Sequence, residues 1–198
     1  MNMKQMINSA IASRYFQFFV TVILFIILYG IGVAMYNGFS RPQVFWNLLI
    51  DNATLIIITV GVTFTIITGG GGIDISVGSV VALVCMSLAW LLQNTELAIP
   101  VALFLVLLIG IAVGFVQGCF ISIFKMQPFI VTLAGLFFCR GMTAVISRDT
   151  INIDNPSYVA IASERIGMFG TGFISVGALV ALIVLIIAII VLKYTKFG

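Results

Sequence analysis

The chain has 198 residues, of which 62% are hydrophobic and only 8% are charged, and it contains no histidine. A soluble domain normally carries about a quarter charged residues, so the composition excludes a soluble protein because there is too little polar side chain to cover a surface in water. The formal net charge of +3 is small and spread along the chain, which argues against a nucleic-acid-binding protein and agrees with the basic cytoplasmic loops of a bacterial inner membrane protein.

Six apolar stretches along the chain predict membrane-spanning helices. A span needs about 20 mainly apolar residues to cross roughly 30 Å of hydrocarbon. The stretches that meet or approach this length are residues 16–36, 48–68, 76–92, 98–124, 129–147 and 174–192. The first is too long for a signal peptide and lacks a small-residue cleavage site, so we expect it to be retained. The fold predicted is an all-α, multi-pass protein with one transmembrane domain over residues 1–198.

The loops between the predicted spans indicate an orientation. Alternating the loops between two sides gives one side five basic residues and no acidic ones, whereas the other side has three basic residues and all the acidic loop residues. The basic side is expected to be cytoplasmic. We therefore predict that both termini are cytoplasmic and that the longest polar segment, 148–171, is an external loop with some local structure.

The stretch "ITGGGGIDISVGS" separates the second predicted span from the third. Glycine costs about 1 kcal/mol relative to alanine in a helix, so four in a row favour a break. A phosphate-binding loop is disfavoured, because no Lys-Ser or Lys-Thr pair follows and the spacing of a dinucleotide fingerprint is absent. We predict a broken helix at 69–76, with Asp74 capping the next span and Ser76 as a second candidate cap. Whether the break also lines a solute path stays open.

Other polar residues within the spans leave alternatives open. Arg140 is expected to have a partner, either Asp74 or the external acidic loop, and it could serve structural pairing or a solute path. Asn52 could likewise serve structural pairing or a solute path. Gly110, Gly114 and Gly118 form a stripe that favours close helix packing, and the neighbouring Gln117 either bonds to another helix or lines a path.

The sequence gives no support for catalytic or metal chemistry. Cys85, Cys119 and Cys139 lie in apolar runs without the spacing of a metal or redox motif, so we interpret them as small buried hydrophobes. An intramembrane enzyme is disfavoured because Asp51 and Asp74 lie at opposite ends of the second span. We expect no catalytic residue, no metal and no cofactor.

Two long segments resemble one known family. They are "GVTFTIITGGGGIDISVGSVVAL" and "KMQPFIVTLAGLFFCRGMTAVIS", and the shorter "DTINIDNPSY" and "YTKFG" also fit. From about Asn47 onwards the chain resembles the permease subunits of bacterial sugar ABC importers, in the ribose, xylose and galactofuranose group, and most nearly the galactofuranose permease. The motif positions of that family are taken by Gly71, Gly72, Asp74, Ser76, Gly78, Pro128, Phe129, Thr132, Arg140 and Gly141.

The resemblance implies a function and partners. It implies a multi-pass subunit in the bacterial plasma membrane that forms the path for a monosaccharide and leaves ATP hydrolysis to a separate ABC ATPase. The other implied partners are a periplasmic or lipid-anchored sugar-binding protein and a second permease copy or paralogue. Candidate path residues are Gly71, Gly72, Asp74, Ser76, Asn52, Phe129, Thr132 and Arg140.

Two features depart from the family pattern. The chain has four glycines before Ile-Asp where the family usually has two, and family members continue beyond the equivalent of Gly198 with an ATPase-docking motif and further spans. The chain thus resembles the N-terminal part of a permease, from a truncated or split gene or a fragment. A non-transporting scaffold or remnant that packs with other subunits is therefore the alternative. The sugar is not determined by the sequence.

Overall fold

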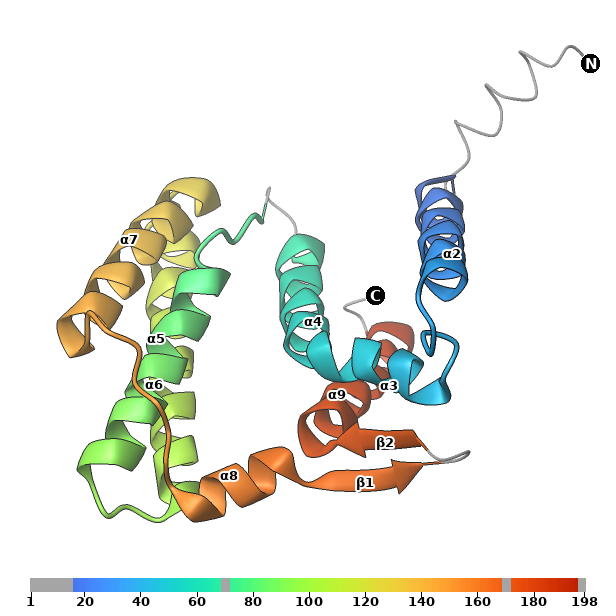
Figure 1. Cartoon of the computed structure of the whole chain (residues 1–198). Helices are drawn as coiled ribbons and strands as arrows, with labels where there is room; N and C mark the ends of the chain where they lie inside the picture. The colour runs from blue at the N-terminus through green and yellow to red at the C-terminus, as the bar shows by residue number, and fades with distance from the viewer. Residues whose placement is uncertain (1–15, 69–71, 169–171, 196–198) are drawn as a thin grey trace, which may run out of the picture.

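The computed structural model describes residues 16–68, 72–168 and 172–195. Helices dominate this part of the chain (Figure 1). In chain order the elements are α2 (Phe16–Met35), α3 (Pro42–Asp51), α4 (Ala53–Ile67), α5 (Val77–Asn94), α6 (Ile99–Ser122), α7 (Pro128–Ile146), α8 (Pro156–Ser163), β1 (Arg165–Met168), β2 (Gly172–Ser175) and α9 (Val176–Tyr194).

The long helices confirm the prediction of an all-α, multi-pass membrane protein. Among the described residues, five helices are long and apolar enough to cross a membrane, and α3 with α4 makes a sixth candidate. Prolines begin α3, α6 and α7 within their first two residues, where the missing N–H costs no helical hydrogen bond. The side of the membrane on which the termini lie stays a prediction.

The second span differs from the prediction, because it is bent by 49° where α3 meets α4 at Asn52. The Asn52 side chain donates its Nδ2 hydrogen to the carbonyl oxygen of Leu48 at 2.8 Å. Such local side-chain bonds compete with the regular helical ladder, which is why Asn is common at helix boundaries. The apolar run alone gave no sign of this bend.

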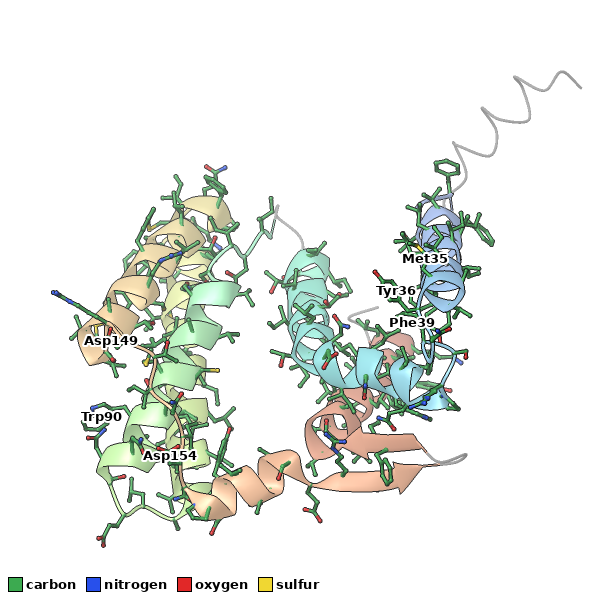
Figure 2. All side chains as sticks on the ribbon, viewed as in Figure 1. Met35, Tyr36, Phe39, Trp90, Asp149 and Asp154 are labelled. Atoms are coloured by element: carbon green, nitrogen blue, oxygen red, sulfur yellow. The ribbon has the colours of Figure 1, made fainter. Side chains whose placement is uncertain are left out.

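The helices pack in two groups (Figure 1). α5 packs against α6 and α7, and α4 packs against α9. Small residues allow these approaches, since Ala102 in the first group and Ala181 in the second are completely buried. α2 stands beside the second group, and no part of its apolar window is buried. Figure 2 shows Met35, Tyr36 and Phe39 at the end of α2 and in the turn that follows it.

The polar segment after α7 follows one end of both groups. It passes Asp149 and Asp154 (Figure 2) and continues as α8 and the antiparallel pair β1–β2 (Figure 1). The predicted local structure is thus confirmed. The predicted start of the last span is wrong, because Ile174 belongs to β2 and α9 begins at Val176. The cap of α9 is Ser175, whose hydroxyl oxygen accepts from the Ala178 N–H at 3.2 Å.

The two strands are joined to α3 by side chains. Gln43 extends the edge of β2, because its Oε1 accepts from the Phe173 N–H at 2.8 Å and its Nε2 donates to the Phe173 carbonyl oxygen at 3.2 Å. The Trp46 ring lies so close to Gly172 that a Cβ there would overlap it. Glycine at 172 is therefore needed for this contact.

We expect Gly172→Val to destabilise the protein, because the added side chain would displace the Trp46 ring. Overpacking of this kind typically costs about 1–3 kcal/mol. Thermal unfolding of the detergent-solubilised protein would measure the effect. The matched control is Gly167→Val in β1, where an added Cβ would have no atom of the described residues within 4 Å. Equal melting temperatures for the two variants would contradict the contact.

Candidate functional site

The chain between α4 and α5 is not helical over its described part, residues 72–76. α4 ends at Ile67 and α5 begins at Val77, which confirms the predicted break over these residues. Gly72 is partly buried at the start of this extended segment. The predicted site residue Gly71 lies outside the described residues.

The non-helical segment is bonded to the helical group formed by α5, α6 and α7. Thr132 of α7 donates its hydroxyl to the Ile73 carbonyl oxygen at 3.2 Å, and Ser76, only 1% exposed, bonds to Gln117 of α6. Thr132 and Gln117 each lie four or five residues from the end of their helix, which corresponds to about 6–8 Å. Non-helical backbone at membrane depth persists where the protein satisfies its polar groups, as Thr132 does here.

Asp74 lies just before the start of α5. Its Oδ1 accepts from the Ser76 N–H at 2.8 Å and from the Ser76 hydroxyl at 2.6 Å. The carboxylate therefore lies at the N-terminal end of α5, where the helix dipole favours negative charge. Asp74 thus lies where the cap was predicted, but it bonds to Ser76, the residue before α5, and no described side chain bonds to the first N–H groups of α5 itself. The predicted second cap is wrong, because the Ser76 hydroxyl accepts no backbone N–H of α5.

The Ser76 hydroxyl instead connects Asp74 to α6. The Gln117 Nε2 donates to the Ser76 Oγ at 3.1 Å, and the Ser76 Oγ lies 2.6 Å from the Asp74 carboxylate oxygen. The hydroxyl carries one proton, and the shorter distance assigns it to the carboxylate, so the bonds run in one direction from amide to hydroxyl to carboxylate. Gln117 therefore makes the bond that was one of its two predicted roles, to the residue that precedes α5.

Gly135 of α7 completes this contact, and the sequence analysis missed it. A Cβ at 135 would overlap the Gln117 side-chain amide and lie 3.5 Å from the Ser76 Cβ. Gly135 follows Thr132 by three residues, so both lie on the same face of α7. A glycine within an apolar helix costs about 1 kcal/mol relative to alanine. This unfavourable residue was the signal in the sequence that could have identified position 135.

A groove of about 270 Å³ lies along the break, between α4 on one side and α5 and α6 on the other. Its polar lining consists of Thr65, Asp74, Ser76 and Gln117, so Gln117 also borders this space. The volume is close to the lower end of the range of small-molecule sites, about 300–1,000 Å³. The break is thus polar, partly enclosed and large enough for a small solute.

The glycine stripe of α6 lies partly in this groove. Gly110 and Gly114 both line it. A Cβ at Gly110 would meet Val84 at 3.6 Å, an ordinary contact, whereas a Cβ at Gly114 or Gly118 would have no described atom within 4 Å. In the described part of the chain the stripe therefore leaves space beside Gln117 and does not form a tight helix contact.

Among the described predicted site residues, Asp74 and Ser76 line the groove, whereas Gly72, Thr132, Asn52, Phe129 and Arg140 do not. Asn52 is at the far end of α4, which at 15 residues is about 22 Å long. The Phe129 side chain is 47% exposed, and its backbone carbonyl accepts from the Thr132 hydroxyl. Arg140 lines a different groove, between α5 and α7. Neither Asp74 nor a described residue of the acidic loop forms an ion pair with Arg140, so both predicted pairings are wrong for the part of the chain described.

We expect Gln117→Leu to lower the stability of the helix group modestly. Leucine preserves the approximate volume but removes the bond to the Ser76 hydroxyl, and a hydrogen bond of this kind contributes about 0.5–1.5 kcal/mol. Thermal unfolding would show a decrease of a few degrees, and Gln93→Leu, at an exposed position near the end of α5, is the control. An unchanged melting temperature would mean that the bond contributes nothing.

Comparison with known proteins identifies the family. The family described as "Branched-chain amino acid transport system / permease component" matches residues 44–198. This chain belongs to that permease family. The inner membrane ABC transporter permease protein YjfF of Escherichia coli is 38% identical over 179 residues, which cover 90% of this chain and 54% of the relative. The fructose import permease protein FruG of Bifidobacterium longum is 33% identical over 183 residues, 89% of this chain and 53% of the relative.

The galactofuranose transporter permease protein YtfT of Escherichia coli is 30% identical over 149 residues, 74% of this chain and 41% of the relative. The predicted resemblance to permeases of sugar ABC importers is therefore confirmed. The permease relatives are named for different sugars, so the family match does not select one. The chain spans about half the length of the curated relatives it matches. No solved structure matches it.

Proposed function

We propose that this chain forms part of the transmembrane subunit of an ATP-binding cassette importer for a monosaccharide, and that the solute passes along the broken helix. The observation that carries the proposal is the non-helical segment 72–76, which bonds to α7 and α6 about 6–8 Å from their ends, beside a groove with four polar side chains in a mainly apolar wall. Broken helices of this type form solute sites in other transporters. The sugar permeases among the relatives support the class of solute.

The groove has the chemistry to hold an uncharged, hydroxyl-rich solute. One carboxylate oxygen of Asp74 accepts from Ser76, and no described residue bonds to the other, which leaves an acceptor for a sugar hydroxyl. The Gln117 amide can donate a second hydrogen, and the Thr65 hydroxyl oxygen can accept one. A few placed polar groups in a mainly apolar wall are typical of small-molecule sites.

We infer that separate subunits complete the importer. An ABC ATPase would hydrolyse ATP, because the relatives are permease proteins of ABC transporters. A periplasmic or lipid-anchored sugar-binding protein would deliver the solute, and a second permease copy or paralogue would supply the other wall of the path. The assembly would lie in the bacterial inner membrane, with both termini of this chain on the cytoplasmic side.

Uptake by proteoliposomes tests this proposal. The permease that contains this chain would be reconstituted with its ATPase and binding protein, and labelled fructose, ribose, galactose and galactofuranose would be supplied in turn. ATP-dependent accumulation of at least one sugar is expected. If the binding protein holds a sugar and the ATPase is active, yet no sugar accumulates, the scaffold alternative is supported and the proposal is wrong.

A further inference from the structure

A second groove lies between α5 and α7, with a volume of about 660 Å³. It uses Gly78, Ala82 and Met86 of α5, whereas the groove at the break uses Val77 and Val81. At 100° per residue these two sets lie on opposite sides of α5. The second groove therefore lies on the other side of α5 from the groove at the break, and Ile75 of the broken segment borders it.

One end of this groove is cationic. Arg140 lies on α7, Arg148 follows two residues after the end of α7, and both line the groove together with Thr143 and Ser147. No acidic residue lines it, and no described carboxylate forms an ion pair with either guanidinium. Two arginines facing one space without a counter-charge form a site for an anion.

The rest of the groove is mainly apolar, with Ser79 as its polar side chain. Its walls beyond the arginines are formed by Ile75, Ala82, Met86 and Leu136, and Phe137, next along α7, is 66% exposed. A small soluble anion would contact only the cationic end. An amphiphile with an anionic head and hydrocarbon chains would contact the whole groove.

Both arginines lie towards one end of α7, a candidate membrane span, and the ends of a span are where lipid headgroups lie. Arg140 lies six residues before the last residue of α7, about 9 Å from the helix end, and arginine side chains reach several ångströms towards the interface. An arginine within a span is expected to have a partner that satisfies its charge. Here the described protein offers none, but a phosphate at the headgroup level would.

We propose that the groove between α5 and α7 binds an anionic phospholipid, with its phosphate between Arg140 and Arg148 and an acyl chain along Ile75 and Leu136. Guanidinium groups bind phosphate through paired, charge-assisted hydrogen bonds. Basic pockets between transmembrane helices are suited to anionic headgroups. The site does not depend on which solute the permease carries.

Native mass spectrometry of the whole permease with added phosphatidylglycerol tests this site. The double variant Arg140→Gln, Arg148→Gln is expected to bind the tightest phosphatidylglycerol at least about tenfold more weakly, since the two charge-assisted pairs are removed. Arg148→Gln alone lies outside the helix, so it is expected to fold normally and to show part of this loss. Arg165→Gln in β1, outside the groove, is the control and should bind as the wild type does.

Two further binding measurements distinguish a lipid from a soluble anion. Phosphatidylcholine, which has no net charge, is expected to bind more weakly than phosphatidylglycerol, and inorganic phosphate at millimolar concentration should not displace the lipid. Displacement by inorganic phosphate would overturn the lipid assignment in favour of a soluble anion. Equal phosphatidylglycerol binding by the double variant and the wild type would show that the arginines do not form the site.

Discussion

Replacing Gly135 by valine is expected to separate α7 from α6 and from the break, and to abolish most of the transport activity. A side chain at 135 would occupy the position of the Gln117 amide and press on Ser76. Neither neighbour can retreat easily, because Ser76 is bound to Asp74 and both Ser76 and Gln117 are buried. Overpacking in such a site costs about 1–3 kcal/mol.

Gly141→Val is the matched control for this experiment. It lies on the same helix, and an added Cβ there would have no atom of the described residues within 4 Å, so the intrinsic effect of valine on helix propensity is the same in both variants. Thermal unfolding and ATP-dependent uptake would be measured for the two in parallel. If Gly135→Val unfolds at the same temperature as Gly141→Val and transports at the wild-type rate, α7 does not need its close approach to Gln117.

The fold could be predicted from the sequence because membrane spans are encoded by length and apolarity. Every predicted span corresponds to a helix or, at 48–68, to a bent pair. The bend at Asn52 was missed because it depends on one side-chain bond to Leu48. The strand β2 was missed because its Ile174 continues the apolar run of α9, and only its pairing with β1 distinguishes the two.

The site could be predicted only in part, for a different physical reason. Asp74 was found because a charge beside a glycine run is conspicuous in an apolar chain. Gly135 and the bond between Gln117 and Ser76 depend on which helices are neighbours. Lipid tails and helix interfaces are similarly apolar, so the hydrophobic pattern does not show which face of a span meets another helix. For the same reason, Asp74 was considered as one of two candidate partners of Arg140, with which it forms no ion pair.

Asp74 offers the sharpest test of the proposed path, because two substitutions separate its cap from its charge. In Asp74→Asn the amide oxygen can still accept from the Ser76 N–H and hydroxyl, so the start of α5 should persist with little loss of stability. In Asp74→Ala the Ser76 N–H loses its partner, whereas the Ser76 hydroxyl still has the Gln117 Oε1 at 3.2 Å. An unsatisfied buried donor costs about 1–3 kcal/mol. The alanine variant is therefore expected to unfold at a clearly lower temperature than the asparagine variant.

Transport should respond differently from stability. A hydrogen bond from a sugar hydroxyl to a carboxylate contributes about 1.5–3 kcal/mol, against about 0.5–1.5 kcal/mol for a neutral acceptor, so loss of the charge alone should reduce uptake about tenfold. Asp51→Asn, at an exposed position of α3, controls for removal of a carboxylate elsewhere. Initial rates of ATP-dependent uptake by proteoliposomes measure the effect. If Asp74→Asn transports at the wild-type rate, Asp74 is only a cap, and the solute does not bind its charge.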